Sequence, residues 1–210
     1  MVTFSKTEIR DLIISISVIT ILFAYMFNGT NGTIGMFLLL IPISLITVGL
    51  SFILHELGHK VVAQKYGFYA EFRRWDAGLI LAIITSLFGF IFLAPGAVYI
   101  GSYTGMITEK ENGVISIAGP LVNLGLALIF LLLGFSIHPW LTSANMDIIA
   151  YLLITCTIGF NINSFLALFN LLPIPMLDGS KVLKWNMPIW LVTIILSGIL
   201  TYLSYTISFI

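Results

Sequence analysis

The chain has 210 residues, of which 59% are hydrophobic and only 9% are charged, with nine basic residues balancing nine acidic ones. An ordinary soluble domain carries about 25% charged residues, so this chain has too few to cover a water-facing surface. The balanced charge leaves no basic face for nucleic acid. The only cysteine, Cys156, excludes an internal disulfide and lies in an apolar run, where we expect an inert buried thiol. We therefore predict one membrane-embedded domain over residues 1–210, with the lipid bilayer as its main solvent.

Two apolar segments begin the chain. About 20 apolar residues cross the hydrocarbon core of a bilayer, which predicts spans near 12–27 and 35–59. The turn-rich residues 28–33 separate them. Lys6 and Arg10 before the first segment resemble the start of a signal peptide. No small-residue cleavage site follows, so we expect a retained span.

The apolar run 79–100 has two interpretations, because it either crosses the membrane or re-enters on the same side. Further spans are predicted near 113–135, 148–172 and 188–208. If the run re-enters, all nine basic residues lie on one side, taken as cytoplasmic, and the external loops near 28–34 and 136–147 hold none. We therefore predict an all-α polytopic membrane protein of the cell membrane, with five to six transmembrane helices and a short re-entrant strand-like segment near 79–101.

The motif His55-Glu56-Leu57-Gly58-His59 lies on the predicted helix near 35–64. Histidines at positions i and i+4 point from one helix face, so both imidazoles can bind one zinc ion. Glu56 follows the first histidine and can act as the general base on a zinc-activated water. Ionisable residues in a span are costly and usually functional. The alternative is a pair of interfacial histidines, with Glu56 paired to Lys60.

A catalytic zinc ion needs about three protein ligands and an open position for water. Asp178 is the leading candidate for the third ligand, because it ends a long uncharged stretch and precedes Gly179. In the five-span arrangement it also lies on the same side of the membrane as the two histidines. The alternative is that Asp178 caps the helix that follows it. His138 is expected to be a surface residue. The remaining acidic candidates are placed in water-facing loops: Glu71, Asp76, Glu109, Glu111 and Asp147.

With two further motifs, the chain resembles the site-2 protease family of intramembrane metalloproteases. The motifs are Ala118-Gly119-Pro120 with Asn123, and the segment from Asn170 to Leu177-Asp178-Gly179. The resemblance implies that His55, His59 and Asp178 bind one zinc ion per chain and that Glu56 is the catalytic base. It implies that Asn170 holds substrate or the oxyanion, that Gly119-Pro120 starts a core helix, and that Pro95–Gly101 forms a strand. Asn123 and Asn170 could instead form hydrogen bonds between helices.

The function that follows is an intramembrane zinc endopeptidase that hydrolyses peptide bonds of transmembrane protein substrates, as in regulated intramembrane proteolysis. Its active site is expected toward the cytoplasm, because hydrocarbon supplies no water. An extended peptide could pair with a strand edge near Gly96–Ser102. The alternatives are a divalent-metal transporter that uses the membrane His and Asp residues, and a catalytically silent membrane scaffold.

Overall fold

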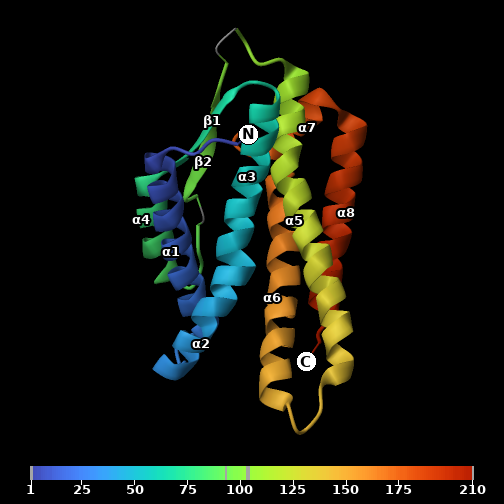
Figure 1. Ribbon diagram of the computed structural model, residues 1–210. Coiled ribbons are helices and arrows are strands. Elements are labelled where there is room, and N and C mark those ends of the chain that lie inside the picture. Colours follow the sequence, from blue (N-terminus) through green and yellow to red (C-terminus); the bar gives the residue numbers. More distant parts are fainter. Residues whose placement is uncertain (1, 93, 103–104, 210) are drawn as a thin grey trace. The chain divides into compact units, whose positions relative to one another are not determined.

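The computed structural model describes residues 2–92, 94–102 and 105–209, which form two compact units, residues 1–106 and 107–210 (Figure 1). Five helical segments of the described chain are long and apolar enough to cross a membrane. An all-α polytopic membrane protein is thereby confirmed. The five segments are Lys6–Asn28, Ile34–Lys65, Glu109–Trp140, Met146–Asn170 and Met187–Thr206.

In the first unit, the second membrane segment contains an irregular turn. It comprises α2 (Ile34–Ser44), the π-helical turn η1 (Leu45–Gly49) and α3 (Leu50–Lys65). Pro42 lies inside α2 and lacks the N–H of a regular helical hydrogen bond, and a single π turn follows it. A Cβ atom on Gly49 would lie 2.8 Å from the side chains of Ile16 and Thr20. Glycine therefore lets η1 pack closely against α1 (Lys6–Asn28).

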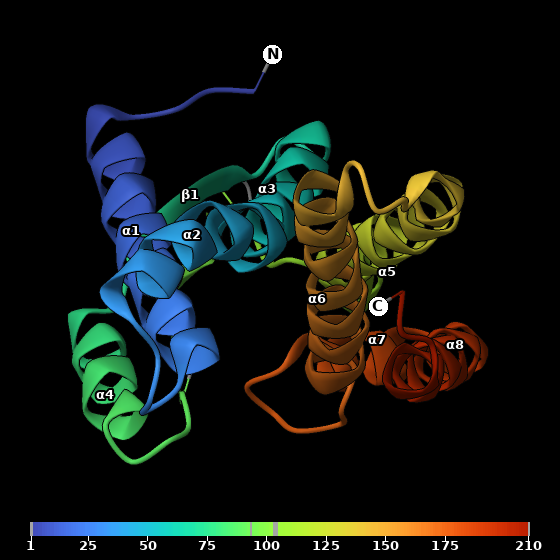
Figure 2. The ribbon, with the colours of Figure 1, turned by 90° about the horizontal axis from the view of Figure 1, so that it is seen from below.

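A two-stranded antiparallel ribbon crosses this unit between α1 and α3, as both ribbon views show (Figures 1 and 2). Strand β1 (Tyr69–Arg74) pairs with β2 (Gly96–Gly101), from Tyr69 opposite Gly101 to Arg74 opposite Gly96. The backbone N–H of Trp75 donates to the carbonyl of Pro95 at 2.9 Å, which extends the pairing by one step. The chain between the strands therefore leaves the ribbon and returns to the same point.

The excursion contains α4 (Asp76–Ser86), an apolar helix of 11 residues. At 1.5 Å per residue this helix is about 16 Å long, roughly half of the hydrocarbon thickness. The strand-like part of the segment predicted near 79–101 is β2, and the helical part starts slightly earlier, at Asp76. Re-entry of this segment into the membrane stays a prediction.

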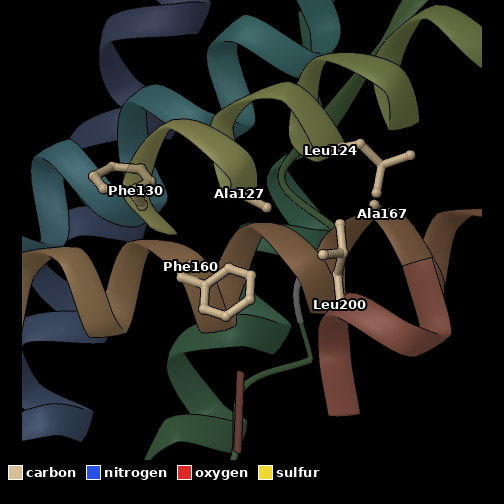
Figure 3. Packing of buried hydrophobic residues seen from close by; sticks show 6 residues of the cluster. All are labelled: Leu124, Ala127, Phe130, Phe160, Ala167 and Leu200. Carbon is tan, nitrogen blue, oxygen red and sulfur yellow. The ribbon is translucent and has the colours of Figure 1, made fainter. Parts of the chain in front are cut away.

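The second unit contains α5 (Glu109–Ile137), η2 (His138–Trp140), α6 (Met146–Asn170), α7 (Asp178–Trp185) and α8 (Met187–Thr206). Figure 2 shows α5 and α8 beside α6. Phe130 of α5 and Phe160 of α6 pack into a buried cluster with Leu200 of α8 (Figure 3). A Cβ atom on Gly159 would lie 2.5 Å from the Phe130 ring. The absence of a side chain at Gly159 thus lets α5 and α6 approach closely.

Three local predictions were wrong. Gly119-Pro120 does not start a helix, because α5 begins at Glu109 and Pro120 lies inside it. The true start is a capping box, in which the Thr108 side chain accepts from the Glu111 N–H and the Glu111 carboxylate accepts from the Thr108 N–H. The polar residues Glu109–Glu111, taken as a loop, are therefore the first helical turn.

Glu71 was expected in a water-facing loop, but it is buried in β1. Its carboxylate accepts hydrogen bonds from the hydroxyls of Ser5 and Tyr69 and from the guanidinium of Arg73, at 2.8 Å for Arg73. The ribbon packs along α1, so Glu71 meets Ser5 and two neighbours on its own strand rather than water.

Candidate metal centre

The two motif histidines project from one face of α3, a turn apart. Their side chains are buried, with 6% of His55 and 7% of His59 exposed. The Nε2 atoms of the two imidazoles lie 3.1 Å apart. Two nitrogens that each lie about 2.0–2.1 Å from one tetrahedral zinc ion would be roughly 3.3 Å apart. The pair therefore fits two ligands of a single zinc ion.

Glu56 lies between the histidines in sequence and is equally buried, with 8% of the residue exposed. Its Oε2 atom accepts a hydrogen bond from the backbone N–H of Val98 in β2, at 3.0 Å. A buried carboxylate that is held by a backbone donor has the surroundings expected of a positioned base. The β1–β2 ribbon thus reaches the motif helix at its acidic residue.

Lys60 does not pair with Glu56. Its ammonium group contacts the carboxylate of Glu8 on α1, and both side chains are almost completely buried. The ring of Phe4 lies 4.0 Å from the Lys60 nitrogen. The alternative in which a Glu56–Lys60 ion pair explains the motif is therefore wrong, because Lys60 is directed to another helix.

Asp178 is the first residue of α7, in the second unit. The capping position belongs to Leu177, which makes no side-chain capping hydrogen bond, so Asp178 is not the helix cap. One carboxylate oxygen of Asp178 lies 3.6 Å from the ammonium of Lys181. The role of Asp178 as third zinc ligand stays a prediction, as do the catalytic roles of Glu56 and Asn170.

The chain next to Asp178 is held closely against the end of α6. A Cβ atom on Gly179 would lie 2.0 Å from the carbonyl oxygen of Leu171 and 2.6 Å from that of Leu172. The indole N–H of Trp190 donates to the same Leu171 carbonyl at 2.8 Å. Only glycine permits this approach, which defines the position of Asp178 within its unit.

Of three other sequence candidates, two form hydrogen bonds within the second unit and the third is exposed. The Asn123 amide donates to the Asn163 side-chain oxygen at 3.0 Å, which is the bond between helices that its second interpretation expects. The Asn170 amide donates to the Leu166 carbonyl of its own helix at 2.9 Å. His138 lies exposed in η2.

Together, the fold and the motif define a polytopic membrane protein with a zinc-type His-Glu-x-x-His helix inside a membrane segment. Comparison with known proteins agrees with this class. The chain is 47% identical to the putative zinc metalloprotease MJ0611 of Methanocaldococcus jannaschii over 204 residues, which cover 96% of this chain and 97% of that protein. It is 31% identical to the putative zinc metalloprotease YwhC of Bacillus subtilis over 161 residues, 71% of each chain.

The chain therefore belongs to the family of these putative zinc metalloproteases. It is also 33% identical to the putative zinc metalloprotease Rip2 of Mycobacterium tuberculosis over 150 residues, which cover 64% of this chain and 53% of that protein. No protein-family model matches the chain, and no solved structure matches it significantly.

Proposed function

We propose that this protein is an intramembrane zinc endopeptidase of the site-2 protease type, which hydrolyses peptide bonds of membrane-spanning substrates. The observation that carries the proposal is the pair of buried Nε2 atoms of His55 and His59, 3.1 Å apart in an apolar membrane segment, with the buried Glu56 between the two histidines in sequence. The family membership supports the metal and the reaction class.

Asp178 is the proposed third ligand, which gives one zinc ion per chain with two imidazoles and one carboxylate. The count of membrane crossings supports this assignment. A chain that crosses with each of the five long helices, and re-enters between β1 and β2, returns to the side of its N-terminus both after α3 and after α6. The ends that carry the histidines and Asp178 then face the same side of the membrane.

A zinc ion held by His55, His59 and Asp178 would supply Lewis acidity, which would polarise the scissile carbonyl and make the attacking water more acidic. The chain's own residues supply the proton transfers. Glu56 accepts the proton of the attacking water and returns it to the leaving amine. Asn170 is proposed as a donor to substrate or to the oxyanion, which requires its amide to leave the Leu166 carbonyl. Water is proposed to enter from the cytoplasmic side of the cell membrane.

The proposed substrate is a transmembrane protein segment that unwinds and pairs with the outer edge of β2, which is not bonded to β1. In antiparallel pairs, residues alternate between hydrogen-bonded and non-hydrogen-bonded positions. The bond from Trp75 to Pro95 places Ala97 and Tyr99 among the positions bonded to β1. The backbone groups of Val98 and Ile100 therefore face the outer edge. The Val98 N–H is held there by Glu56, so a pairing peptide would meet the backbone of Ile100 rather than that of Ala97 or Tyr99.

The deciding experiment is cleavage of a single-span test substrate by purified protein in detergent, with bound zinc measured in parallel. Glu56→Gln is expected to lower kcat by roughly 10²–10⁴ while zinc content is unchanged, because the ligands remain and only the base is lost. His55→Ala is the matched control, and it is expected to lose zinc as well as cleavage.

Two other outcomes would count against the proposal. If wild-type protein binds zinc but cuts no substrate, and zinc crosses the bilayer of loaded liposomes, the divalent-metal transporter is the better assignment. If Glu56→Gln cleaves as fast as wild type, a protease that uses Glu56 as its base is excluded.

A further inference from the structure

We propose that Glu8 and Lys60 are positioning residues for Glu56. They hold the β1–β2 ribbon against α3 in the one placement where the Val98 N–H meets the Glu56 carboxylate. The inference rests on the proposed role of Glu56 as catalytic base, but it is carried by contacts within the first unit alone.

The first link is the hydrogen bond from Val98 to Glu56. Val98 lies at a position of β2 where the backbone is not bonded to β1, so its N–H is available to a partner on the outer edge. That partner is Glu56, at 3.0 Å. The orientation of the Glu56 carboxylate therefore depends on where β2 lies relative to α3.

The second link lies directly across the ribbon. Phe72 is the β1 residue opposite Val98, and its outward N–H donates to Oε1 of Glu8 at 3.0 Å. Glu8 belongs to α1, where none of its surface is exposed. The Val98–Phe72 pair is thus bound at both outer edges, by Glu56 on the β2 side and by Glu8 on the β1 side.

The third link returns to α3. The second oxygen of Glu8 binds the ammonium of Lys60, whose side chain is 1% exposed. Lys60 lies four residues after Glu56, one turn along the same face of the helix. The contacts therefore close a ring, from Glu56 through Val98, Phe72 and Glu8 to Lys60 and back along α3.

A closed ring of this kind constrains the ribbon from both edges. Few other groups can compete for the two charges of a buried ion pair. Its geometry is therefore held more tightly than that of an exposed pair. Loss of the Glu8–Lys60 contact would leave β1 attached to α1 and packed on α3 through the Phe52 and Phe72 rings, but would remove the polar link that aligns the ribbon with α3. The predicted consequence is a Glu56 carboxylate that no longer keeps the Val98 N–H.

The test uses the double variant Glu8→Gln/Lys60→Met. Removing one charge alone would leave the other buried and unpaired, which could unfold the protein, whereas the double change removes both charges at similar side-chain size. The amide introduced by Glu8→Gln keeps an oxygen that can accept from Phe72, so only the link to α3 is broken. The matched control is Asp76→Asn, which removes the ion pair of Arg74 with the exposed Asp76 next to the same ribbon.

The first readout is the amide hydrogen exchange of Val98, measured by NMR in detergent on ¹⁵N-valine-labelled protein. Exchange at Val98 is expected to rise at least about fivefold in the double variant and in Glu56→Ala, and to stay at the wild-type rate in Asp76→Asn. Unchanged Val98 exchange in the double variant would overturn the proposal, whether or not the protein proves to be a protease.

The second readout separates positioning from general loosening. In the double variant, kcat for the test substrate is expected to fall about tenfold, with KM and zinc content within about twofold of wild type. Faster Val98 exchange with an unchanged kcat would overturn the positioning role while leaving the proposed protease function intact. Loss of zinc together with activity would also overturn it, because the pair would then support the whole metal centre.

Discussion

Gly179 shows how a single residue without a side chain determines the position of a neighbouring carboxylate. Its backbone lies so close to the Leu171 carbonyl that no other residue fits. This close approach also determines the position of Asp178, because Asp178 directly precedes Gly179 and is the first residue of α7. The Leu-Asp-Gly segment thus combines a proposed ligand with the packing that places it.

Gly179→Ala is expected to destabilise the protein by roughly 1–3 kcal/mol, because the added methyl group overlaps with backbone oxygens that cannot move freely. Zinc affinity should fall as well, if Asp178 is a ligand. Unfolding in mixed detergent micelles measures the first effect, and competition with a zinc chelator measures the second. Gly198→Ala is the control, since a Cβ atom on Gly198 in α8 meets nothing within 4 Å. Equal stability of the two variants would contradict the packing argument.

A second residue-scale prediction concerns the Asn123–Asn163 bond between α5 and α6, whose two side chains are completely buried. Asn123→Ala leaves the Asn163 oxygen without this donor and is expected to cost about 1–2 kcal/mol of unfolding free energy. The double variant with Asn163→Ala should cost less than the sum of the two single changes. Full additivity in that mutant cycle would show that the bond contributes nothing.

At the scale of elements, the backbone groups of β2 have two different roles: some bond to β1 and hold the ribbon together, and others face its outer edge. Alternate residues of β2 bond to β1 or face the outer edge, so neighbouring positions should respond differently to the same substitution. Proline removes one N–H and is tolerated in strands chiefly where that N–H is unpaired.

Ala97→Pro is therefore expected to disrupt the pairing with β1, whereas Ile100→Pro should keep the ribbon and weaken only substrate binding. Under the strand-addition proposal, Ile100→Pro raises KM for the test substrate several-fold with zinc content unchanged. Steady-state cleavage and zinc analysis of both variants make the comparison. Wild-type KM in a folded Ile100→Pro protein would count against strand addition on this edge.

At the scale of the whole molecule, the prediction of five crossings with one re-entrant excursion specifies which loops share a side of the membrane. Thr3 and Lys184 are expected on one side, and Thr30 and Ser143 on the other. A crossing by the 79–100 run would instead place Lys184 with Thr30.

Single cysteines at these four positions test the arrangement with a membrane-impermeant thiol reagent on sealed, oriented vesicles. We expect Thr30→Cys and Ser143→Cys to react from outside, and Thr3→Cys and Lys184→Cys only after the membrane is opened. The buried native Cys156 should stay unlabelled and serves as the background control. External labelling of Lys184→Cys would contradict the five-span topology.

Metal removal is the second prediction at this scale. A ligand that binds only the folded state stabilises it by about 2.7 kcal/mol at a concentration 100 times its Kd. Chelation should therefore lower the melting temperature of wild-type protein and leave that of His55→Ala unchanged. Asp178→Ala is expected to show a reduced response, because one of three proposed ligands is lost. A full wild-type response in Asp178→Ala would remove Asp178 from the ligand set.

Short-range patterns in the sequence were enough to predict the membrane class, the five long helices, the strand near Pro95–Gly101 and the His-Glu-x-x-His pair. Hydropathy is summed over about 20 adjacent residues, and the i, i+4 relation follows from helix geometry alone. Such properties need no knowledge of distant neighbours. The misplaced start of α5 shows the limit, because the Thr108 capping box carried the true signal and Pro120 was given more weight.

Only the tertiary structure decided which partners the buried polar groups have. Lys60 binds Glu8 rather than Glu56 although 52 residues separate them, and Glu56 binds a backbone N–H 42 residues away. An ionisable residue in an apolar segment signals that a partner exists, but it does not identify that partner. The partner depends on how α1, α3 and the ribbon pack, and packing is a property of surfaces that come together only when the chain has folded.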